Sequence, residues 1–190
     1  PTGTLPTLDE IKSLAEKSCV LVDESFIDFL AVESARGLVS EKISVVQSLT
    51  KIFAIPGLRL GFAVVEEKLA ERLNLAKDVW NVNFLAQKAG AAALSDEEFL
   101  ASTLAWLAAE RGFFVERLKN LAGVEVVGGA ANFVLIRLKN AQAVLSELRR
   151  RKILVRNCAN FAGLDERFLR VAVRSRAENL RLLENLEAIL

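Results

Sequence analysis

The first half of the chain contains two kinds of segment, which differ in their pattern of apolar and polar positions. Three short apolar runs predict buried strands at residues 19–22, 43–47 and 59–65. Residues 7–17 and 66–77 instead repeat apolar positions at helical spacing. The first of these helices opens at Thr7 with the Thr-x-x-Glu form of a capping box. Strands that alternate with helices in this way predict an α/β layer.

The second half predicts a linking helix and a compact α+β module. Residues 83–94 are small and apolar nearly all round, which is typical of a helix between domains or subunits and equally of a plain core helix. Ser95-Asp96-Glu97-Glu98 predicts a capping box for a helix that runs to Leu121. The remaining elements are strands 124–127, 132–138, 153–155 and 168–173 and helices 141–151 and 176–190. We therefore expect one domain over 1–95 and another over 96–190.

Composition excludes several classes of partner. Apolar residues make up 52% of the 190 positions and charged residues 26%, which predicts a globular chain with a buried core. Lysine and arginine total 25 against 24 acids, so a net charge of +1 gives no field that would attract nucleic acid or an anionic membrane. No run approaches the roughly 20 apolar residues that span a bilayer, so we expect no membrane partner.

The rarer residue types restrict both the compartment and the chemistry. Cys19 and Cys158 are too few for a disulfide framework, and no charged leader precedes an apolar stretch, so a cytoplasmic location is expected. The sequence contains no histidine and no tyrosine. A histidine-based triad, a histidine-bound zinc ion and a tyrosine general acid are therefore excluded for this chain, and we expect no metal site.

Lys51 is the most informative residue of the chain. It lies in Ser48-Leu49-Thr50-Lys51, just beyond the predicted strand 43–47, where open α/β sheets place ligands. The run 19–22 ends in Asp23-Glu24 and supplies a carboxylate at the end of a neighbouring strand. Pyridoxal 5'-phosphate needs an amine to hold it, a carboxylate at its ring nitrogen and donors for its phosphate. These residues therefore predict a pyridoxal-phosphate site.

Each residue of this set has an expected role. Asp23 is expected to be a buried acid that favours a proton on the ring nitrogen by direct attraction. Ser48 precedes Lys51 by one helical turn and is expected to donate to the phosphate. Arg59, beyond the Pro56-Gly57 turn, is expected to clamp the same phosphate with two hydrogen bonds.

The ordered set of strand, acid pair, Ser-x-x-Lys and Pro-Gly-x-Arg resembles fold-type I pyridoxal-phosphate enzymes of the class I/II aminotransferase group, over almost the entire chain. Pro1-Thr2-Gly3 is similar to the tail of that family's Asn-Pro-x-Gly turn. The resemblance implies that Asp23 pairs with the pyridine nitrogen, that Lys51 forms the Schiff base, and that Ser48 and Arg59 take the phosphate. Phe26 stands where many aminotransferases have a tyrosine.

The same resemblance implies the architecture and the assembly. The fold expected is the α/β fold-type I transferase fold, with the C-terminal part of the large domain in residues 1–95. Residues 96–190 would hold the interdomain helix and the small α+β domain. Enzymes of this group build their sites at a dimer interface, which implies a homodimer.

Within the group, residues 153–164 and the run Arg170-Val171-Ala172-Val173-Arg174 resemble the L-threonine-O-3-phosphate decarboxylases of cobalamin synthesis. This branch implies decarboxylation of a small phosphorylated amino acid, with Arg170 at the substrate carboxylate and Arg156 at a second anion, the substrate phosphate. Which anion each arginine holds stays open. The histidinol-phosphate aminotransferases are next in resemblance, and they imply amino transfer as the alternative reaction.

Two further interpretations compete with these. Ser48-x-x-Lys51 also matches the nucleophile and base of penicillin-binding acyl enzymes, but the Ser-x-Asn and Lys-Thr-Gly elements that should accompany it are absent from the sequence. If the chain lacks the family's first portion, three alternatives are open: an inert fragment, an interaction module or the ordered remnant of a complete enzyme.

Overall fold

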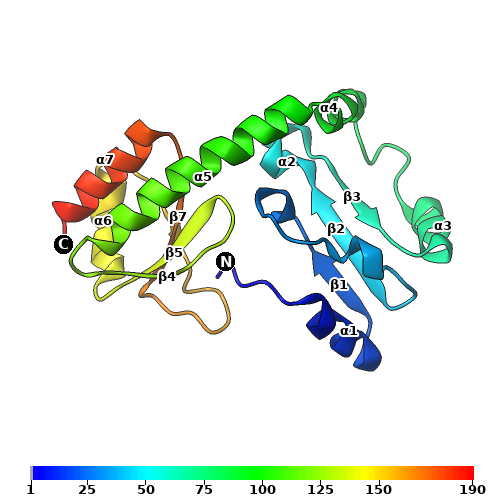
Figure 1. Ribbon diagram of the computed structural model, residues 1–190, viewed down its shortest axis with the longest axis horizontal. Helices are drawn as coiled ribbons and strands as arrows, with labels where there is room; N and C mark the ends of the chain where they lie inside the picture. The colour runs from blue at the N-terminus through cyan, green and yellow to red at the C-terminus, as the bar shows by residue number, and fades with distance from the viewer. Residues whose placement is uncertain (1) are drawn as a thin grey trace. The chain divides into compact units, whose positions relative to one another are not determined.

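The computed structural model describes residues 2–190; Pro1, the first residue of the Pro-x-Gly tail noted above, lies outside the described residues. The chain forms two compact units, one of residues 5–103 and one of residues 2–4 with 104–190. The division falls within a long helix, α5 (Glu97–Lys119) (Figure 1). The assignment of 1–95 and 96–190 to the large and small domains of the family stays a prediction.

The unit of residues 5–103 contains a three-stranded sheet in the order β1-β2-β3. Its elements are α1 (Leu8–Lys17), β1 (Val20–Asp23), β2 (Ile43–Ser48), α2 (Leu49–Ile52), β3 (Gly61–Val64), α3 (Glu67–Ala76) and α4 (Phe84–Leu94), with single 3-10 turns at Ile27–Phe29, Ala35–Leu38 and Pro56–Leu58. β1 runs parallel to β2, and β3 runs antiparallel to it. The three strands predicted in this region are confirmed with small shifts of their ends.

The core of this unit lies between α1 and one face of the sheet. Ile43 and Val45 of β2 are buried against Ile11 and Ala15 of α1, the residues that gave the helical spacing. The predicted capping box at Thr7 is confirmed, because the Thr7 side chain accepts from the Glu10 backbone and the Glu10 carboxylate accepts from the Thr7 N–H. Since side chains alternate along a strand, Ser48 belongs to the opposite face of β2.

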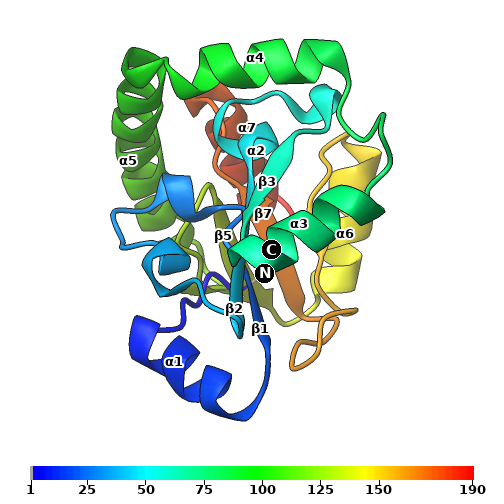
Figure 2. The same cartoon turned by 90° about the vertical axis from the view of Figure 1, so that its right-hand side faces the viewer.

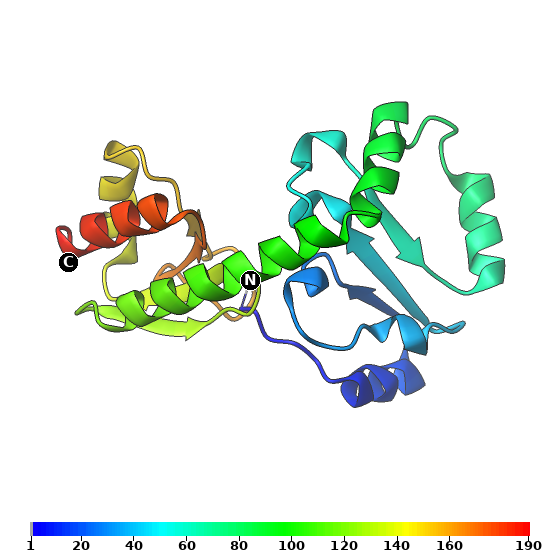
Figure 3. The same cartoon turned by 45° about the horizontal axis from the view of Figure 1, so that its top comes forward.

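The unit that contains residues 104–190 is built on an antiparallel sheet in the order β4-β5-β7-β6. Its elements after α5 are β4 (Val124–Gly128), β5 (Phe133–Leu138), α6 (Ala141–Arg150), β6 (Arg156–Asn157), β7 (Phe168–Ala172) and α7 (Arg176–Glu187). The sheet and the helices share one core. Five of its residues are 0% exposed: Phe114, Val134, Leu148, Leu169 and Leu186. Figure 3 shows α7 lying beside the second half of α5. No helix of the described residues is long and apolar enough to cross a membrane.

The strand predicted at residues 153–155 is wrong. The Ile153 N–H bonds the Leu148 carbonyl at 2.8 Å, so it closes the end of α6 instead of joining the sheet. Lys152, which precedes it, has a left-handed backbone with φ of 59°, and Leu154 is 84% exposed. The chain enters the sheet only at Arg156, whose strand pairs with β7.

The capping box predicted at Ser95 is also wrong, by one residue. Asp96 caps α5, because its carboxylate accepts from the Phe99 N–H at 2.9 Å. The Ser95 hydroxyl instead donates backwards to the Ala91 carbonyl of α4, at 3.2 Å. Two residues with good capping side chains stand next to each other, and the end of α4 decides which of them begins α5.

A buried acid network fastens α7 to α5. The Glu110 carboxylate of α5 is 8% exposed and accepts from Arg176 Nε and Nη2, at 3.0 and 2.9 Å, and from Asn179 Nδ2 at 3.3 Å. The Arg176 guanidinium also lies 3.8 Å from the centroid of the Phe113 ring. The hydrogen bonds from Arg176 hold the pKa of Glu110 below its usual range, and burial opposes them only in part.

This network predicts an acid-sensitive attachment of α7. Because the pKa of Glu110 is lower in the folded state, its contribution is complete above the ordinary glutamate pKa of about 4.3 and is lost as pH falls through the folded-state value. We expect Glu110→Gln to lower the melting temperature at pH 7 and to flatten its decline between pH 5 and pH 3. Calorimetry at a series of pH values measures both, with the exposed Glu116→Gln as control; equal acid dependence in all three proteins would contradict the prediction.

Candidate active site

Three polar groups meet at the carboxyl end of β2. Lys51 Nζ donates to Ser48 Oγ at 3.0 Å and to Thr50 Oγ1 at 3.3 Å, and the two hydroxyls lie 2.8 Å apart. Ser48 ends β2 and Lys51 lies in the short helix α2, so the lysine follows the strand as predicted. The amine is exposed and lies 5.6 Å from the centroid of the Phe26 ring. An accessible amine is therefore held in place by two hydroxyls.

Asp23 lies on the neighbouring strand and on the same face as Ser48. It pairs in parallel register with Val46, two residues before Ser48, which places the two Cα atoms about 8 Å apart. The expectation that Asp23 is buried is wrong, because its side chain is exposed. Its Oδ1 accepts from the Ser25 backbone N–H and hydroxyl, at 2.9 and 2.5 Å. Ser25 fixes the carboxylate by one oxygen and leaves the other without a donor among the described residues.

Glu24 is the buried member of the acid pair, and its importance was missed at the level of sequence. It is 6% exposed, and its carboxylate accepts from Ser34 Oγ at 2.6 Å, from the Ala35 N–H at 2.7 Å and from Gln47 Nε2 at 2.8 Å. Gln47 is itself 5% exposed and directly precedes Ser48. The network joins the ends of β1 and β2 to the segment at residues 34–35. Alternation along the strand was the available signal, since consecutive acids face opposite sides.

Arg59 lies in a turn with an uncommon backbone. Arg59 and Ala54, at φ of 57° and 52°, are left-handed residues on either side of the Pro56–Leu58 turn. Such a conformation costs a residue with a Cβ about 1–2 kcal/mol and concentrates at functional sites. The exposed guanidinium donates to the Pro56 carbonyl at 3.0 Å. The turn therefore presents an available cation on the segment that follows Lys51.

The two predicted substrate arginines are cross-strand neighbours. Arg156 of β6 pairs with Arg170 of β7, so both side chains leave the same face of that sheet. Arg170 lies 4.8 Å from the centroid of the Phe133 ring; Arg156 lies 5.4 Å from that of Phe161 and donates to Asn160 Oδ1 at 3.1 Å. No carboxylate pairs with either arginine among residues 2–190. Two like charges placed opposite each other without an acid form a candidate anion site.

The structure therefore brings the predicted residues together in two groups. Ser48 and Lys51 are in contact, with Asp23 and Arg59 on adjoining segments of the same unit, residues 5–103. Arg156 and Arg170 are together in the other unit.

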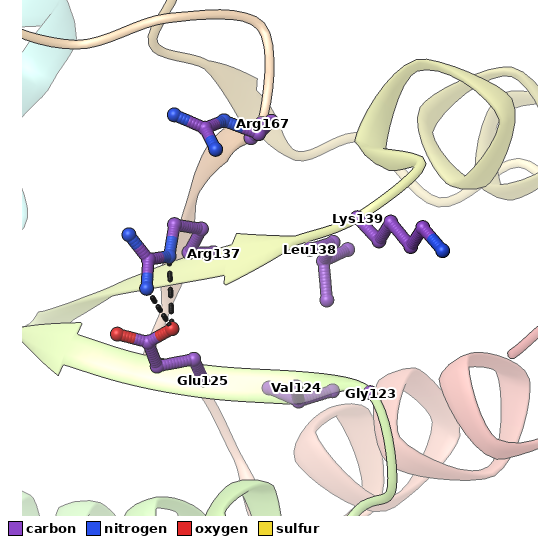
Figure 4. A pocket seen from close by; sticks show the side chains of 7 residues that line it. All are labelled: Gly123, Val124, Glu125, Arg137, Leu138, Lys139 and Arg167. Carbon is purple, nitrogen blue, oxygen red and sulfur yellow. Dashed lines mark hydrogen bonds and ion pairs between the residues drawn. The ribbon is translucent and has the colours of Figure 1, made fainter.

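A cavity of about 470 Å³ elsewhere in the second unit does not form a comparable site. It is lined by Gly123, Val124, Glu125, Arg137, Leu138, Lys139 and Arg167. Arg137 donates to Glu125, and Arg167 is paired with Asp165 at 2.6 Å. Figure 4 shows the Lys139 side chain pointing away from the Arg137–Glu125 pair. Two cations of this cavity are paired with acids, and the third, Lys139, points away from them, so we assign the cavity no ligand.

Comparison with known proteins identifies the family. The model of the family "aminotransferase class I and II" matches residues 1–186. The chain belongs to this family. The resemblance drawn from the residues around Lys51 is thereby confirmed, and so is the predicted α/β transferase fold.

Relatives of two kinds are similar to the chain. The threonine-phosphate decarboxylase of Salmonella typhimurium is 39% identical over 202 residues, which cover 100% of this chain and 55% of that protein. The histidinol-phosphate aminotransferase of Nitratidesulfovibrio vulgaris is 36% identical over 200 residues, which cover 100% of this chain and 53% of that protein. The chain thus spans about half the length of these curated relatives.

Solved structures divide in the same way. The histidinol-phosphate aminotransferase of Clostridium acetobutylicum superposes with a TM-score of 0.92 at 28% identity, covering 100% of this chain and 60% of that one. The L-threonine-O-3-phosphate decarboxylase of Porphyromonas gingivalis superposes with a TM-score of 0.86 at 27% identity, covering 99% of this chain and 61% of that one. A histidinol-phosphate aminotransferase from Sinorhizobium meliloti, alike in fold, was solved in complex with pyridoxal-5'-phosphate.

The residues present fit pyridoxal 5'-phosphate, the cofactor that the family indicates. The Lys51 amine is accessible to an aldehyde, and the Ser48 and Thr50 hydroxyls beside it are donors for a phosphate. Asp23 offers a carboxylate oxygen without a donor, and Arg59 offers a guanidinium on the adjoining turn. The donor set contains what the cofactor requires, whereas the described residues include no cluster that would hold a metal ion.

The Glu24 network yields a stability prediction. Glu24→Ala leaves three donors without their acceptor, two of them in buried surroundings, and we expect a loss of about 2–3 kcal/mol in the free energy of unfolding. Urea unfolding measures this loss, and hydrogen exchange should report faster exchange at the Ala35 amide. The exposed Glu33→Ala is the matched control and should stay within about 0.5 kcal/mol of wild type. Equal stability of the two variants would contradict the assigned network.

Proposed function

We propose that the protein containing this chain uses pyridoxal 5'-phosphate to decarboxylate a small phosphorylated amino acid, L-threonine O-3-phosphate. The observation that carries the proposal is the convergence of the Lys51 amine with the Ser48 and Thr50 hydroxyls at the end of β2, in a chain of this family. The choice of decarboxylation is supported by the 39% identity to the Salmonella typhimurium enzyme.

Each residue has a definite task in this proposal. When bound, the cofactor supplies an electron sink for the bond that breaks at the substrate α-carbon. Lys51 would hold the cofactor through Nζ and, when free, would return a proton to the substrate α-carbon. The Asp23 carboxylate would favour a proton on the ring nitrogen by direct attraction. Ser48 and Arg59 would donate hydrogen bonds to the phosphate.

The arginine pair orients the substrate. Guanidinium groups bind carboxylate and phosphate through paired hydrogen bonds, and Arg156 and Arg170 present two of them from paired positions. Which bond at the substrate α-carbon breaks would depend on how the arginines hold the carboxylate. One arrangement would favour loss of carbon dioxide, and another would expose the hydrogen and favour amino transfer.

Amino transfer of the histidinol-phosphate type is the second candidate, supported by the Nitratidesulfovibrio vulgaris relative and the Clostridium acetobutylicum structure. A fragment without activity is the third, because the relatives are nearly twice as long; the mass of the intact protein tests it. A cytoplasmic location stays a prediction.

A homodimer is part of the same proposal. Four apolar residues in the segment 79–85 are 67–87% exposed, and such apolar surface supports contact with a second copy; they are Val79, Trp80, Phe84 and Leu85. Sedimentation equilibrium of the purified protein distinguishes monomer from dimer.

The cofactor proposal predicts a covalent attachment at Lys51. We expect the wild-type protein to absorb in the visible with pyridoxal 5'-phosphate and, after borohydride reduction, to carry the cofactor on the peptide that contains Lys51. Lys51→Ala should lose both signals, whereas Lys68→Ala, at an exposed position of α3, should keep them. Absorption spectra and peptide mass spectrometry measure the outcome, and attachment at any other lysine would refute the assignment.

Measuring the products of two assays distinguishes decarboxylation from amino transfer. We expect carbon dioxide from L-threonine O-3-phosphate and little amino transfer from histidinol phosphate in single-turnover assays. Arg170→Ala should raise the KM by about 10- to 100-fold, the value of a charged hydrogen-bond pair, with the visible band retained. Arg149→Ala, at an exposed position of α6, serves as control. Amino transfer as the faster reaction would select the second candidate.

A further inference from the structure

Helix α4 contacts the residues on both sides of Arg59. Asn83 Nδ2 donates to the Leu58 carbonyl at 3.3 Å, while its Oδ1 accepts from the Ala86 N–H at 2.9 Å and caps α4. One side chain thus begins the helix and holds the turn. Figure 2 shows α4 lying next to α2 in the same unit.

The second contact is at Gly90. This glycine is buried in α4, and a Cβ added there would overlap the Leu60 side chain and meet Leu49 Cδ1 at 3.6 Å. Leu60 therefore sits in a space that exists because residue 90 has no side chain. Glycine weakens a helix interior by about 1 kcal/mol relative to alanine, so this position favours the contact over helix stability.

The turn between these contacts needs support from outside. Arg59 has a left-handed backbone and is exposed, and its guanidinium donates to the Pro56 carbonyl of the same turn. No side-chain cap holds the Pro56–Leu58 turn at its start. Support comes from Asn83 at the residue before Arg59 and from the space at Gly90 for the residue after it.

We propose that Asn83 and Gly90 are positioning residues that hold Arg59 in the orientation in which it binds the phosphate of the cofactor. The inference rests on the proposed function, because it assumes that Arg59 binds that phosphate. A turn held at both neighbours fixes the backbone from which the Arg59 side chain extends, so less ordering remains when the ligand arrives, and preorganisation of this kind increases affinity.

The test compares two ligands that differ only in the phosphate. Dissociation constants for pyridoxal 5'-phosphate and for pyridoxal are measured by absorbance titration. The dissociation constant of pyridoxal divided by that of pyridoxal 5'-phosphate, the phosphate ratio, reports the phosphate contribution. Asn83→Asp keeps an acceptor for the helix cap and loses the donor to Leu58. We expect the ratio to fall by about three- to tenfold. Asn81→Asp, an exposed position two residues earlier, is the matched control and should keep the wild-type ratio.

Gly90→Ala supplies an independent perturbation. Alanine favours the helix, but its Cβ overlaps the Leu60 side chain and displaces it, so we expect the phosphate ratio to fall. One outcome would overturn the inference and leave the proposed function intact: the phosphate ratio falls to about one in Arg59→Ala but keeps its wild-type value in Asn83→Asp and Gly90→Ala. If wild-type protein binds both ligands equally, the proposed function fails and the inference fails with it.

Discussion

The pairing of β2 with β3 is the constraint on which the candidate site depends. Ser48 of β2 lies opposite Gly61 of β3, so the two ends of the loop 49–60 lie next to each other. This loop carries both Lys51 and Arg59. A Cβ at Gly61 would lie 2.6 Å from the Gln47 carbonyl, so only glycine permits this closure. The lysine and the arginine are therefore near each other because a backbone register closes their loop, and not because they contact one another.

A second constraint acts on the other side of β2. The buried Glu24 carboxylate draws its three donors from neutral groups, and none of the described cations pairs with it. A charge in such surroundings is stable only while its donors stay in place, so the network resists local opening. Asp23 next to it is exposed and available to a ligand. The two acids therefore differ: the Glu24 carboxylate fixes the strand ends, and the Asp23 carboxylate is the one that the proposed function uses.

The sequence was most informative where a local pattern determines the structure. The run before Ser48 predicted a strand, and the lysine follows its end as expected, because strand and helix periods differ clearly over a few residues. Errors arose where tertiary contacts choose between equivalent residues. Both Asp23 and Glu24 could have been buried, and strand alternation chose Glu24. Both Ser95 and Asp96 could cap α5, and the end of α4 chose Asp96.

The mistaken strand at 153–155 bears on specificity within the family. Because the Ile153 N–H closes α6, the chain joins the sheet late, and Arg156 stands on an edge strand that pairs with β7 alone, and its side chain contacts the segment after it. These contacts are with Asn160 and the Phe161 ring. Arg170, by contrast, sits on an inner strand over Phe133. In the proposed function, the arginine on the inner strand has the more fixed position, and the branch-specific residues after Arg156 adjust the other anion contact. Under this proposal, the difference between decarboxylation and amino transfer would depend on this edge segment, since the residues proposed to hold the cofactor around Lys51 would serve both reactions.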